Sequence, residues 1–442
     1  MVSKQMRILT WIFIFTTNFL IVYCDEILIK DYKELKCTYD PETGDQVCDC
    51  KNRKRNFILP LLEGTLKNVI VKNCKEVKVL QETFQNVDYI EHIQFDKIKE
   101  LSLENYSLQF KQRLPIPKIK LIFNDVRFSE ILPHSISGCI DSISFNNSHI
   151  EKLSAYAINS VCQTVYKLSI ENTKIDWVDS QALKKLSIEH FIMQNTTFSH
   201  DLPSRTFSAL IIKNVMSITN CTFAGISTRT IELDDGNDFI FSNNKVDRLD
   251  GEAFRMNANG RIIFERNNFS QISHSALSAI NLGENAKHHQ NEIQFLANEI
   301  KATDFPIRLD VARDFNLRIL DLKFSTPINC DKAKEFRRNA FLQKYTETVY
   351  FRIAESTDDD YSSLSAIMSN RCTIRTYFIA LIWTGIVFIV ILSIIATAFF
   401  YRFWMKRRPN RQISMVIPDG KTYCETQIMI QIENAGLLKT NL

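Results

Sequence analysis

The segment from Phe239 to Phe254 has the sequence FIFSNNKVDRLDGEAF, and its apolar pattern decides the fold. Counted from Phe239, the apolar residues fall at offsets 0, 2, 7, 10 and 15. The segment from Ile143 to Ile158, ISFNNSHIEKLSAYAI, has apolar residues at the same offsets. A chain that is 45% hydrophobic does not repeat this pattern six times by chance. The other four segments begin at Leu121, Leu168, Met216 and Ile262.

The repeats follow one another at nearly constant intervals. A seventh segment begins at Phe191 and slips by one residue after Phe198, and with it successive repeats start 22 to 25 residues apart. A unit of this length cannot bury its own apolar face and must stack on its neighbours. The sequence therefore predicts a solenoid with a shared interior.

The spacing inside each repeat predicts its local structure. Offsets 0 and 2 are separated by one residue that faces the other way, as in a short strand. The remaining apolar offsets are three to five residues apart, which indicates a return segment of loops and helical turns. Offset 5 holds a small hydrogen-bonding side chain, which suits a buried turn whose backbone groups need partners. The offset-5 residues are Ser148, Thr173, Thr196, Cys221, Asn244, Asn267 and, in a later repeat, Asn298.

This pattern resembles the leucine-rich repeat family, whose consensus L-x-x-L-x-L-x-x-N-x-L it follows with Ile and Phe in place of many Leu. The resemblance covers residues 69–325. It implies an α/β solenoid, namely a leucine-rich repeat horseshoe with a concave parallel sheet and cysteine-containing caps, to which the apolar segment described below adds one transmembrane helix. A parallel β-helix is the alternative fold for the same period. Pairs of a small and a large residue, which extracellular members of the family often carry, occur at Ala157-Ile158, Ala182-Leu183, Ala253-Phe254 and Ala276-Leu277.

Two apolar segments predict that the chain enters the secretory pathway and crosses a membrane once. Residues 1–24 combine Lys4 and Arg7 with an apolar run, as a signal peptide does, and an uncleaved anchor is the alternative. Residues 376–401 contain no charged side chain and are long enough to span a bilayer; a buried core helix is the alternative. Basic residues follow at once, which assigns the tail, 402–442, to the cytosol. We therefore expect a type I plasma-membrane protein with an extracellular N-terminus.

The predicted extracellular region, 25–375, holds 45 basic and 47 acidic residues. This balance predicts no overall preference for polyanions and no nucleic-acid partner. The one basic cluster in this region comprises Lys51, Arg53, Lys54 and Arg55. Such a cluster is usually solvated surface charge, and proteoglycan binding is the alternative.

Nine cysteines lie in this region, where an oxidising compartment favours disulfide bonds. The resemblance implies an N-terminal cysteine cap in 25–74, repeats in 75–325 and a C-terminal cap in 326–375. We expect Cys330 to pair with Cys372, Cys139 with Cys162, and Cys221 to be a free core thiol, although spacing does not fix connectivity. Zinc is the rival use of clustered cysteines, and the secretory location disfavours it. Two further bridges are expected among Cys37, Cys48, Cys50 and Cys74.

N-x-S/T sequons predict N-linked glycans, and all of them lie on the expected extracellular side. Two sequon asparagines fall at offset 4, immediately after the predicted strand, so their glycans would occupy one edge of the concave sheet. The sequon residues are Asn105, Asn146, Asn195, Asn220 and Asn268.

The predicted concave sheet is the expected ligand-binding surface, because residues at offsets 1 and 3 face solvent there. Isoleucines at offset 1 are costly to expose, and a contiguous apolar patch marks an interaction site. The alternative is that each isoleucine contacts its neighbours in the sheet and is only half exposed. The expected ligand-binding residues are Ile122, Asn124, Glu171, Ile192, Gln194, Ile240, Ser242, Ile263 and Glu265.

The tail is too short for an ordinary folded signalling domain, so any signal must pass through linear motifs. Thr440 and Leu442 match the C-terminal motif that PDZ domains bind by strand addition. Glu433 followed by Leu437 and Leu438 fits the acidic dileucine pattern that endocytic adaptors bind. These motifs predict a cytosolic PDZ-domain protein and an endocytic adaptor as partners.

No catalytic arrangement is recognisable, because the chain lacks a Gly-rich phosphate loop, G-x-S-x-G and H-E-x-x-H. We therefore expect neither enzyme activity nor a cofactor. The sequence predicts a cell-surface recognition or adhesion receptor that binds a protein ligand through its repeat ectodomain. The alternative is a non-signalling co-receptor, decoy or trafficking component that acts in cis on another membrane protein.

Overall fold

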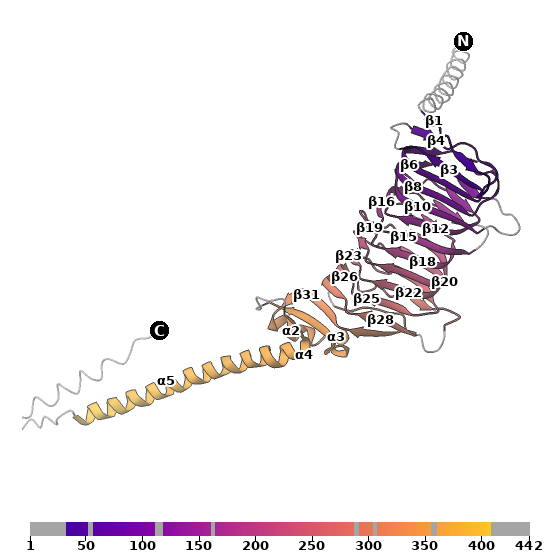
Figure 1. Cartoon of the computed structure of the whole chain (residues 1–442). Helices are drawn as coiled ribbons and strands as arrows, with labels where there is room; N and C mark the ends of the chain where they lie inside the picture. The colour runs from indigo at the N-terminus through magenta and orange to yellow at the C-terminus, as the bar shows by residue number, and fades with distance from the viewer. Residues whose placement is uncertain are drawn as a thin grey trace, which may run out of the picture. The chain divides into compact units, whose positions relative to one another are not determined.

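A computed structural model describes residues 32–51, 56–110, 118–160, 164–286, 291–303, 307–354 and 360–407. The chain divides into two compact units, one ending at Thr373 and the other beginning at Ile374. The first unit is a solenoid of parallel β-strands that are stacked in successive turns (Figure 1).

The expected leucine-rich repeat horseshoe is wrong, because most turns form strands on three faces. Offsets 0 and 2 lie on a first face, offsets 7 and 10 on a second, and offset 15 on a third. In the turn that starts at Ile143, these faces are β12 (Ile140–Asn146), β13 (His149–Leu153) and β14 (Ile158–Ser160). The return segment therefore consists of strands where loops and helical turns were expected, and the first face is not a concave sheet.

A repeated irregularity in the second-face strands explains the wrong expectation. Ile150 pairs with Ile175 and Leu153 with Val178, but Glu151 lies between them outside the register. Two residues thus separate the buried Ile150 from the buried Leu153. Apolar residues three apart also lie on the same face of an α-helix. In every solenoid turn with this irregularity, the sequence pattern is therefore the same as that of a short helix.

The strands of the three faces belong to one continuous sheet, apart from a two-stranded sheet of β5 (Glu63–Thr65) and β7 (Asn86–Tyr89), because long strands bend from one face onto the next. The first face contains β3 (Asp45–Asp49), β6 (Asn68–Val79), β8 (His92–Leu103), β10 (Ile119–Phe128), β12, β15 (Val165–Glu171), β18 (Ser187–Gln194), β20 (Phe207–Thr219), β22 (Ile231–Ser242), β25 (Ile262–Glu265), β28 (Glu292–Leu296) and β30 (Asn316–Leu320). The second contains β1 (Tyr32–Glu34), β4 (Asn56–Ile58), the ends of β6, β8 and β10, β13, β16 (Lys174–Val178), β19 (Thr197–Phe198), β21 (Thr222–Phe223), β23 (Lys245–Leu249), β26 (Asn268–Ile272), β29 (Glu299–Thr303), β31 (Leu322–Ile328) and β32 (Val349–Ile353). The third contains β5 (Glu63–Thr65), β7 (Asn86–Tyr89), β9 (Leu108–Phe110), β11 (Ile136–Gly138), β14, β17 (Leu183–Lys184), the beginnings of β20 and β22, β24 (Phe254–Ala258) and β27 (Ile280–Leu282).

Strands one turn apart pair in a parallel register that places equal offsets directly above one another. Phe123 pairs with Phe145, and the centroids of their rings are 4.9 Å apart. Phe241 pairs in the same way with Phe264. All thirty apolar residues in the six rows of five are buried. The prediction of an interior shared by stacked repeats is therefore confirmed.

The first corner, between the first and second faces, turns at one residue per turn in the left-handed conformation. Asn147 and Asn172 have φ of 50°, Asn195 of 51° and Asn220 of 55°. Asparagine tolerates this conformation better than most residues. The sequence therefore supplies at offset 4 the residue type that the corner requires.

The offset-5 side chains point inward and form a buried hydrogen-bonded ladder. The Oδ1 atom of Asn267 accepts from the backbone N–H of Asn244 at 2.9 Å, and its Nδ2 donates to the carbonyl oxygen of Phe241 at 2.7 Å. The backbone N–H of Asn267 in turn donates to Oδ1 of Asn298 at 2.8 Å. The expectation that offset 5 satisfies buried backbone groups is confirmed.

Disulfide bonds hold the first turns together. Cys37 is bonded to Cys48, and Cys50 to Cys74. The strand β2 (Thr38–Asp40) runs antiparallel to β3, so the parallel stacking ends there.

The other two cysteine predictions concern the middle turns. Cys139 is disulfide-bonded, and its expected partner, Cys162, lies outside the described residues. Cys221 is the free cysteine among the residues that the structure describes, and it is buried in the offset-5 ladder. Burial raises the pKa of its thiol to about 12, so the thiol stays protonated and unreactive at neutral pH.

Short helices and an antiparallel strand close the other end of the solenoid. Ala333 and Leu342 bury their side chains there, and a disulfide bond joins Cys330 to Cys372. These elements are α2 (Cys330–Phe336), α3 (Ala340–Lys344), β33 (Tyr361–Ser363), α4 (Leu364–Ala366) and the π-helix η1 (Ile367–Cys372).

The second unit contains the helix α5 (Thr373–Arg407). Its segment Tyr377–Arg407 is long and apolar enough to cross a membrane. This segment is compatible with a membrane anchor, and it includes most of the predicted span at 376–401.

Candidate binding surface on the solenoid

The isoleucines predicted to bind a ligand lie in one column of the first face. Ile122, Ile192, Ile240 and Ile263 are all half-buried. Ile240 pairs directly with Ile263, whereas serines separate the other members of the column. Among the described residues, the column thus brings only Ile240 and Ile263 of these isoleucines together, and serines interrupt it elsewhere. The separating residues are Ser144, Ser169 and Ser217.

The polar residues predicted at offset 3 form the adjacent column, where several are engaged within the sheet. The Nδ2 atom of Asn146 donates to Oδ1 of Asn124 at 2.9 Å, and Glu171 lies 3.6 Å from the ammonium group of Lys167. Ser242 is buried. Contacts of this kind stabilise neighbouring strands. In order along the solenoid, the column contains Asn124, Asn146, Glu171, Gln194, Thr219, Ser242 and Glu265.

The predicted glycosylation sites divide into exposed and engaged asparagines. Asn105, Asn195 and Asn220 are exposed. Asn146 and Asn268 are half-buried, and the latter donates to Glu299 at 3.2 Å. All except Asn105 lie at or beside the first corner, so that corner is where glycans would gather. Glycosylation itself stays a prediction.

The second corner, between the second and third faces, also turns at one left-handed residue per turn, but its residues are large. Tyr156 has a φ of 58° and Arg205 of 61°, close to the value for Asn195 at the first corner. A left-handed conformation costs such residues about 1–2 kcal/mol each. Successive turns thus accept a backbone cost to carry long side chains. We call these residues the tyrosine–arginine corner: Tyr106, His134, Tyr156, Gln181, Arg205, Arg229 and Glu252.

The backbone holds this corner at a fixed spacing. The N–H of Gln181 donates to the carbonyl oxygen of Arg205 at 2.9 Å, and that of Arg205 to the carbonyl oxygen of Arg229 at 2.8 Å. The N–H of Arg229 continues the series to Glu252 at 2.8 Å. Each corner side chain is therefore separated from the next by one strand spacing, about 4.8 Å.

Aromatic rings occupy the N-terminal half of the corner. The rings of Tyr106 and His134 are nearly parallel, with centroids 5.4 Å apart, and that of Tyr156 follows at 5.7 Å from His134. The ammonium group of Lys184 lies 5.2 Å from the Tyr156 ring centroid and 2.8 Å from Oε1 of Gln181. These contacts fix the rings and leave their outer edges at the surface, as the 38% exposure of Tyr106 indicates.

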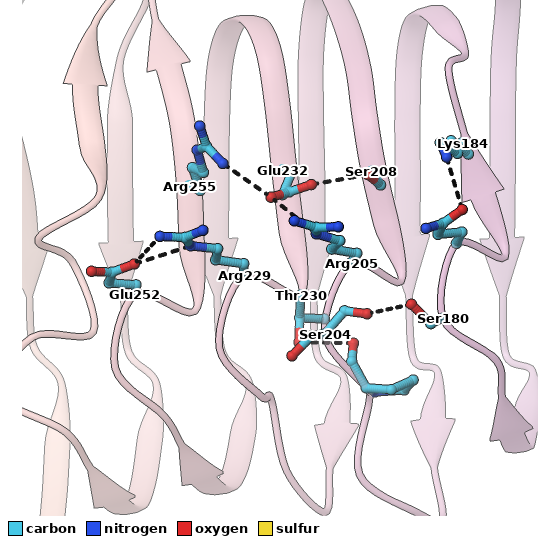
Figure 2. Close-up of polar contacts among 12 residues, drawn as sticks. Ser180, Lys184, Ser204, Arg205, Ser208, Arg229, Thr230, Glu232, Glu252 and Arg255 are labelled. Carbon is cyan, nitrogen blue, oxygen red and sulfur yellow. Dashed lines mark hydrogen bonds and ion pairs between the residues drawn. The ribbon is translucent and has the colours of Figure 1, made fainter.

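Charged residues occupy the other half, as Figure 2 shows. Glu232, on the third face, lies between Arg205 and Arg255, at 4.0 and 3.5 Å, and accepts a hydrogen bond from Ser208 at 2.9 Å. Its side chain is 13% exposed, whereas those of Arg205 and Arg255 are 54% and 53% exposed. Two guanidinium groups thus share one carboxylate and keep donors free for a partner.

Sequence reasoning missed this surface, although a signal for it exists. Tyr156, Gln181, Arg229 and Glu252 all fall at offset 13, each directly before a buried small residue. A long polar or aromatic residue that recurs before a small one indicates an outward corner. Its left-handed backbone becomes evident only in the structure.

A second exposed aromatic lies on the second face. The indole of Trp177 is 56% exposed and stacks on the ring of His200, with centroids 3.5 Å apart. Beside it, Asp176 accepts hydrogen bonds from Ser199 at 2.6 Å and pairs with Lys174 at 2.7 Å. Burial alone would raise the pKa of Asp176, but bonds from Lys174, Ser199 and His149 outweigh that effect and hold it well below its usual range.

Asp176→Asn should therefore destabilise the solenoid in a pH-dependent way. Because the pKa of Asp176 is depressed in the folded state, its contribution is fully present above the ordinary carboxyl pKa of 3.8 and is lost progressively as the pH falls from there through the lower folded-state pKa, so the loss should be smaller at pH 3 than at pH 7. At pH 7 we expect a loss of about 2 kcal/mol, the size of hydrogen bonds to a charged group. Urea unfolding at pH 7 and pH 3 measures it; an equal loss at both pH values would contradict this role.

No group of three or more His, Cys, Asp or Glu side chains that could hold a metal occurs among the described residues. Several predicted sites fall outside them. These are the signal peptide at 1–24, Arg53, Lys54 and Arg55 of the basic cluster, and the tail motifs with Glu433, Leu437, Leu438, Thr440 and Leu442.

The three-faced turns have a counterpart among known protein families. Residues 156–302 match the right-handed β-helix family model. This match and the strands on three faces overturn the resemblance to leucine-rich repeats, and the segment 75–325 forms a parallel β-solenoid instead. No curated protein and no solved structure matched the chain. Right-handed β-helix domains occur both in enzymes and in proteins without activity. The match therefore identifies the fold but does not indicate whether the chain catalyses a reaction.

Proposed function

We propose that this chain is a cell-surface recognition protein whose β-helix binds an extracellular protein through the tyrosine–arginine corner. The observation that carries the proposal is the choice of residues at left-handed positions. At the first corner this conformation is mostly given to Asn or Asp, whereas the second gives it to Tyr, His, Gln, Arg and Glu. Unfavourable backbone conformations retained at a surface point to a functional role.

The chemistry of the corner favours a protein ligand. Tyrosine and arginine are the residue types that, with tryptophan, contribute most to binding energy in protein interfaces. The corner covers seven successive turns, or roughly 30 Å at one strand spacing per turn, which suits an interface of ordinary size. Its side chains are fixed by their neighbours before binding, so little conformational entropy is lost on association.

Membrane anchoring supports the cell-surface part of the proposal. Tyr377–Arg407 can cross a bilayer, and the residues that follow it are rich in Lys and Arg, which favours a cytosolic tail. The disulfide bonds are consistent with an extracellular β-helix. In this arrangement the tail motifs would connect the protein to a PDZ-domain protein or an endocytic adaptor.

The test is a binding screen in which cells display the full chain and are probed with a library of secreted and cell-surface ectodomains. For any partner found, Tyr156→Asn, Arg205→Asn and Arg229→Asn are combined, because asparagine tolerates the left-handed backbone and should preserve the fold. We expect the affinity to fall at least thirtyfold, the loss of one strong interface residue. Arg266→Asn, a left-handed position at the first corner, is the matched control and should change affinity less than twofold.

Unchanged binding by the triple variant would refute the assignment of the corner. Binding that appears only when the partner is expressed in the same membrane would favour the alternative, a co-receptor or trafficking component acting in cis.

A further inference from the structure

A second surface, at the N-terminal end of the first corner, has a different chemistry. A cavity of ≈ 800 Å³ lies across four successive turns there, outside the tyrosine–arginine corner. We call it the lysine groove. It is lined by Cys74, Lys75, Lys97, Ile98, Lys99, Asp125, Val126, Arg127, Asn147 and His149.

The register of the strands brings the cations of the groove together. Cys74 pairs with Ile98, and Ile98 also pairs with Val126, so the residues that follow them lie on three successive turns. Those residues are Lys75, Lys99 and Arg127. One strand spacing, about 4.8 Å, separates neighbouring backbones in this series. Like charges at such a spacing repel one another, unless a ligand supplies the opposite charge.

The groove keeps most of its positive charge uncompensated. Arg127 is bound by Glu151, with Nε to Oε1 at 2.9 Å, and His149 by Asp176 at 2.7 Å. Lys75, Lys97 and Lys99, in contrast, form no ion pair with any residue that the structure describes, and all three are exposed. Asp125 is the one acidic residue in the lining.

Lys97 shows the same unusual residue choice as the tyrosine–arginine corner. It has a φ of 54° at the first corner, where the next turns use Asp125 and Asn147. A lysine therefore occupies a left-handed position that asparagine fills at lower cost. Its side chain extends the row of Lys75 and Lys99 across the corner and adds a third free ammonium group to the groove.

We propose that the lysine groove binds a sulfated glycosaminoglycan chain. The region 25–375 as a whole is nearly neutral, so this is local recognition and not a general attraction to polyanions. Ammonium groups at a repeated spacing match a linear chain that carries anionic groups at intervals. An acidic peptide is the competing ligand, and a repeating row of sulfates fits a row of lysines on successive turns better than scattered carboxylates do.

The test uses the full chain purified in detergent and a heparin oligosaccharide as the probe, with desulfated heparin and polyglutamate as comparison ligands. The groove variant combines Lys75→Gln, Lys97→Asn and Lys99→Gln. The matched control combines Lys245→Gln, Arg266→Asn and Lys301→Gln, which removes the same formal charge several turns away. Arg266 is also left-handed, and all three control side chains are exposed.

We expect the groove variant to lose at least tenfold in heparin affinity and the control to lose less than twofold. The slope of log affinity against log salt concentration should fall by roughly one for each lysine removed. Equal losses in both variants, binding of desulfated heparin as tight as that of heparin, or preference for polyglutamate would each overturn the proposal. The triple variant of the tyrosine–arginine corner should still bind heparin, so failure of either proposal is visible independently of the other.

Discussion

Replacing Asn267 with leucine should lower the free energy of unfolding by about 3–5 kcal/mol. The backbone N–H of Asn244 and the Nδ2 of Asn244 would lose Oδ1 of Asn267, their acceptor at 2.9 and 3.1 Å. The carbonyl oxygen of Phe241 would lose the Nδ2 donor at 2.7 Å. Each buried polar group left without a partner costs about 1–3 kcal/mol, and leucine, of similar size, returns only part of that by burial of its apolar surface.

Denaturant unfolding of the full chain in detergent measures this loss. Asn257→Leu is the matched control, because Asn257 is exposed and donates a single hydrogen bond to the carbonyl oxygen of Asp234 at 3.0 Å. We expect the control to lose less than about 1 kcal/mol, as surface substitutions do. If Asn267→Leu were as mild as the control, the ladder would contribute nothing to stability.

Removal of the disulfide bond between Cys330 and Cys372 should cost about 4 kcal/mol. The two cysteines are 42 residues apart. Without the bond, a loop of that length gains conformational entropy in the unfolded chain, which lowers the free energy of unfolding by this amount. The short helices α2 and α3 bury only a few side chains. Without the bond we therefore expect this end of the β-helix to open before the rest.

The variant Cys330→Ser with Cys372→Ser tests this by limited proteolysis and denaturant unfolding. Cys37→Ser with Cys48→Ser provides a comparison, since these residues are 11 apart and the same relation gives about 3 kcal/mol. Early cleavage between α2 and η1 is the expected result. Cleavage that begins in the middle turns of both variants would contradict it.

The repeat period and the buried residues could be predicted from the sequence, but the path of the chain within one turn could not. Residues such as Phe145 and Phe241 are apolar at equal offsets because they stack, and that pattern holds for any solenoid. The spacing from Ile150 to Leu153 arises from a strand irregularity and is the same as that of a helical turn. An asparagine at offset 5 satisfies a tight turn in both kinds of solenoid. Local sequence patterns therefore could not distinguish a leucine-rich repeat solenoid from a β-helix.

The candidate site was less predictable than the fold. Ile192 and Ile240 were selected because a horseshoe exposes that side of its sheet, and the β-helix leaves them half-buried in a column that serines interrupt. The binding surface proposed instead depends on backbone conformation. A long residue that recurs before a small buried one indicates an outward corner, but it does not show that Arg205 adopts the left-handed conformation. The backbone cost at Arg205 is evident only from its φ of 61°.

The backbone N–H of each left-handed residue at the second corner donates to the following turn. One complete turn is therefore the segment that can be added or removed while this hydrogen bonding is kept. Duplicating one complete turn would extend every face by one strand and add one more side chain to each corner, while the core contacts between turns stay equivalent. Inserting a single residue within a strand would instead exchange inward and outward side chains up to the next corner. Whole-turn gain or loss is therefore the route by which such a protein can lengthen or shorten its binding surface without redesigning its interior.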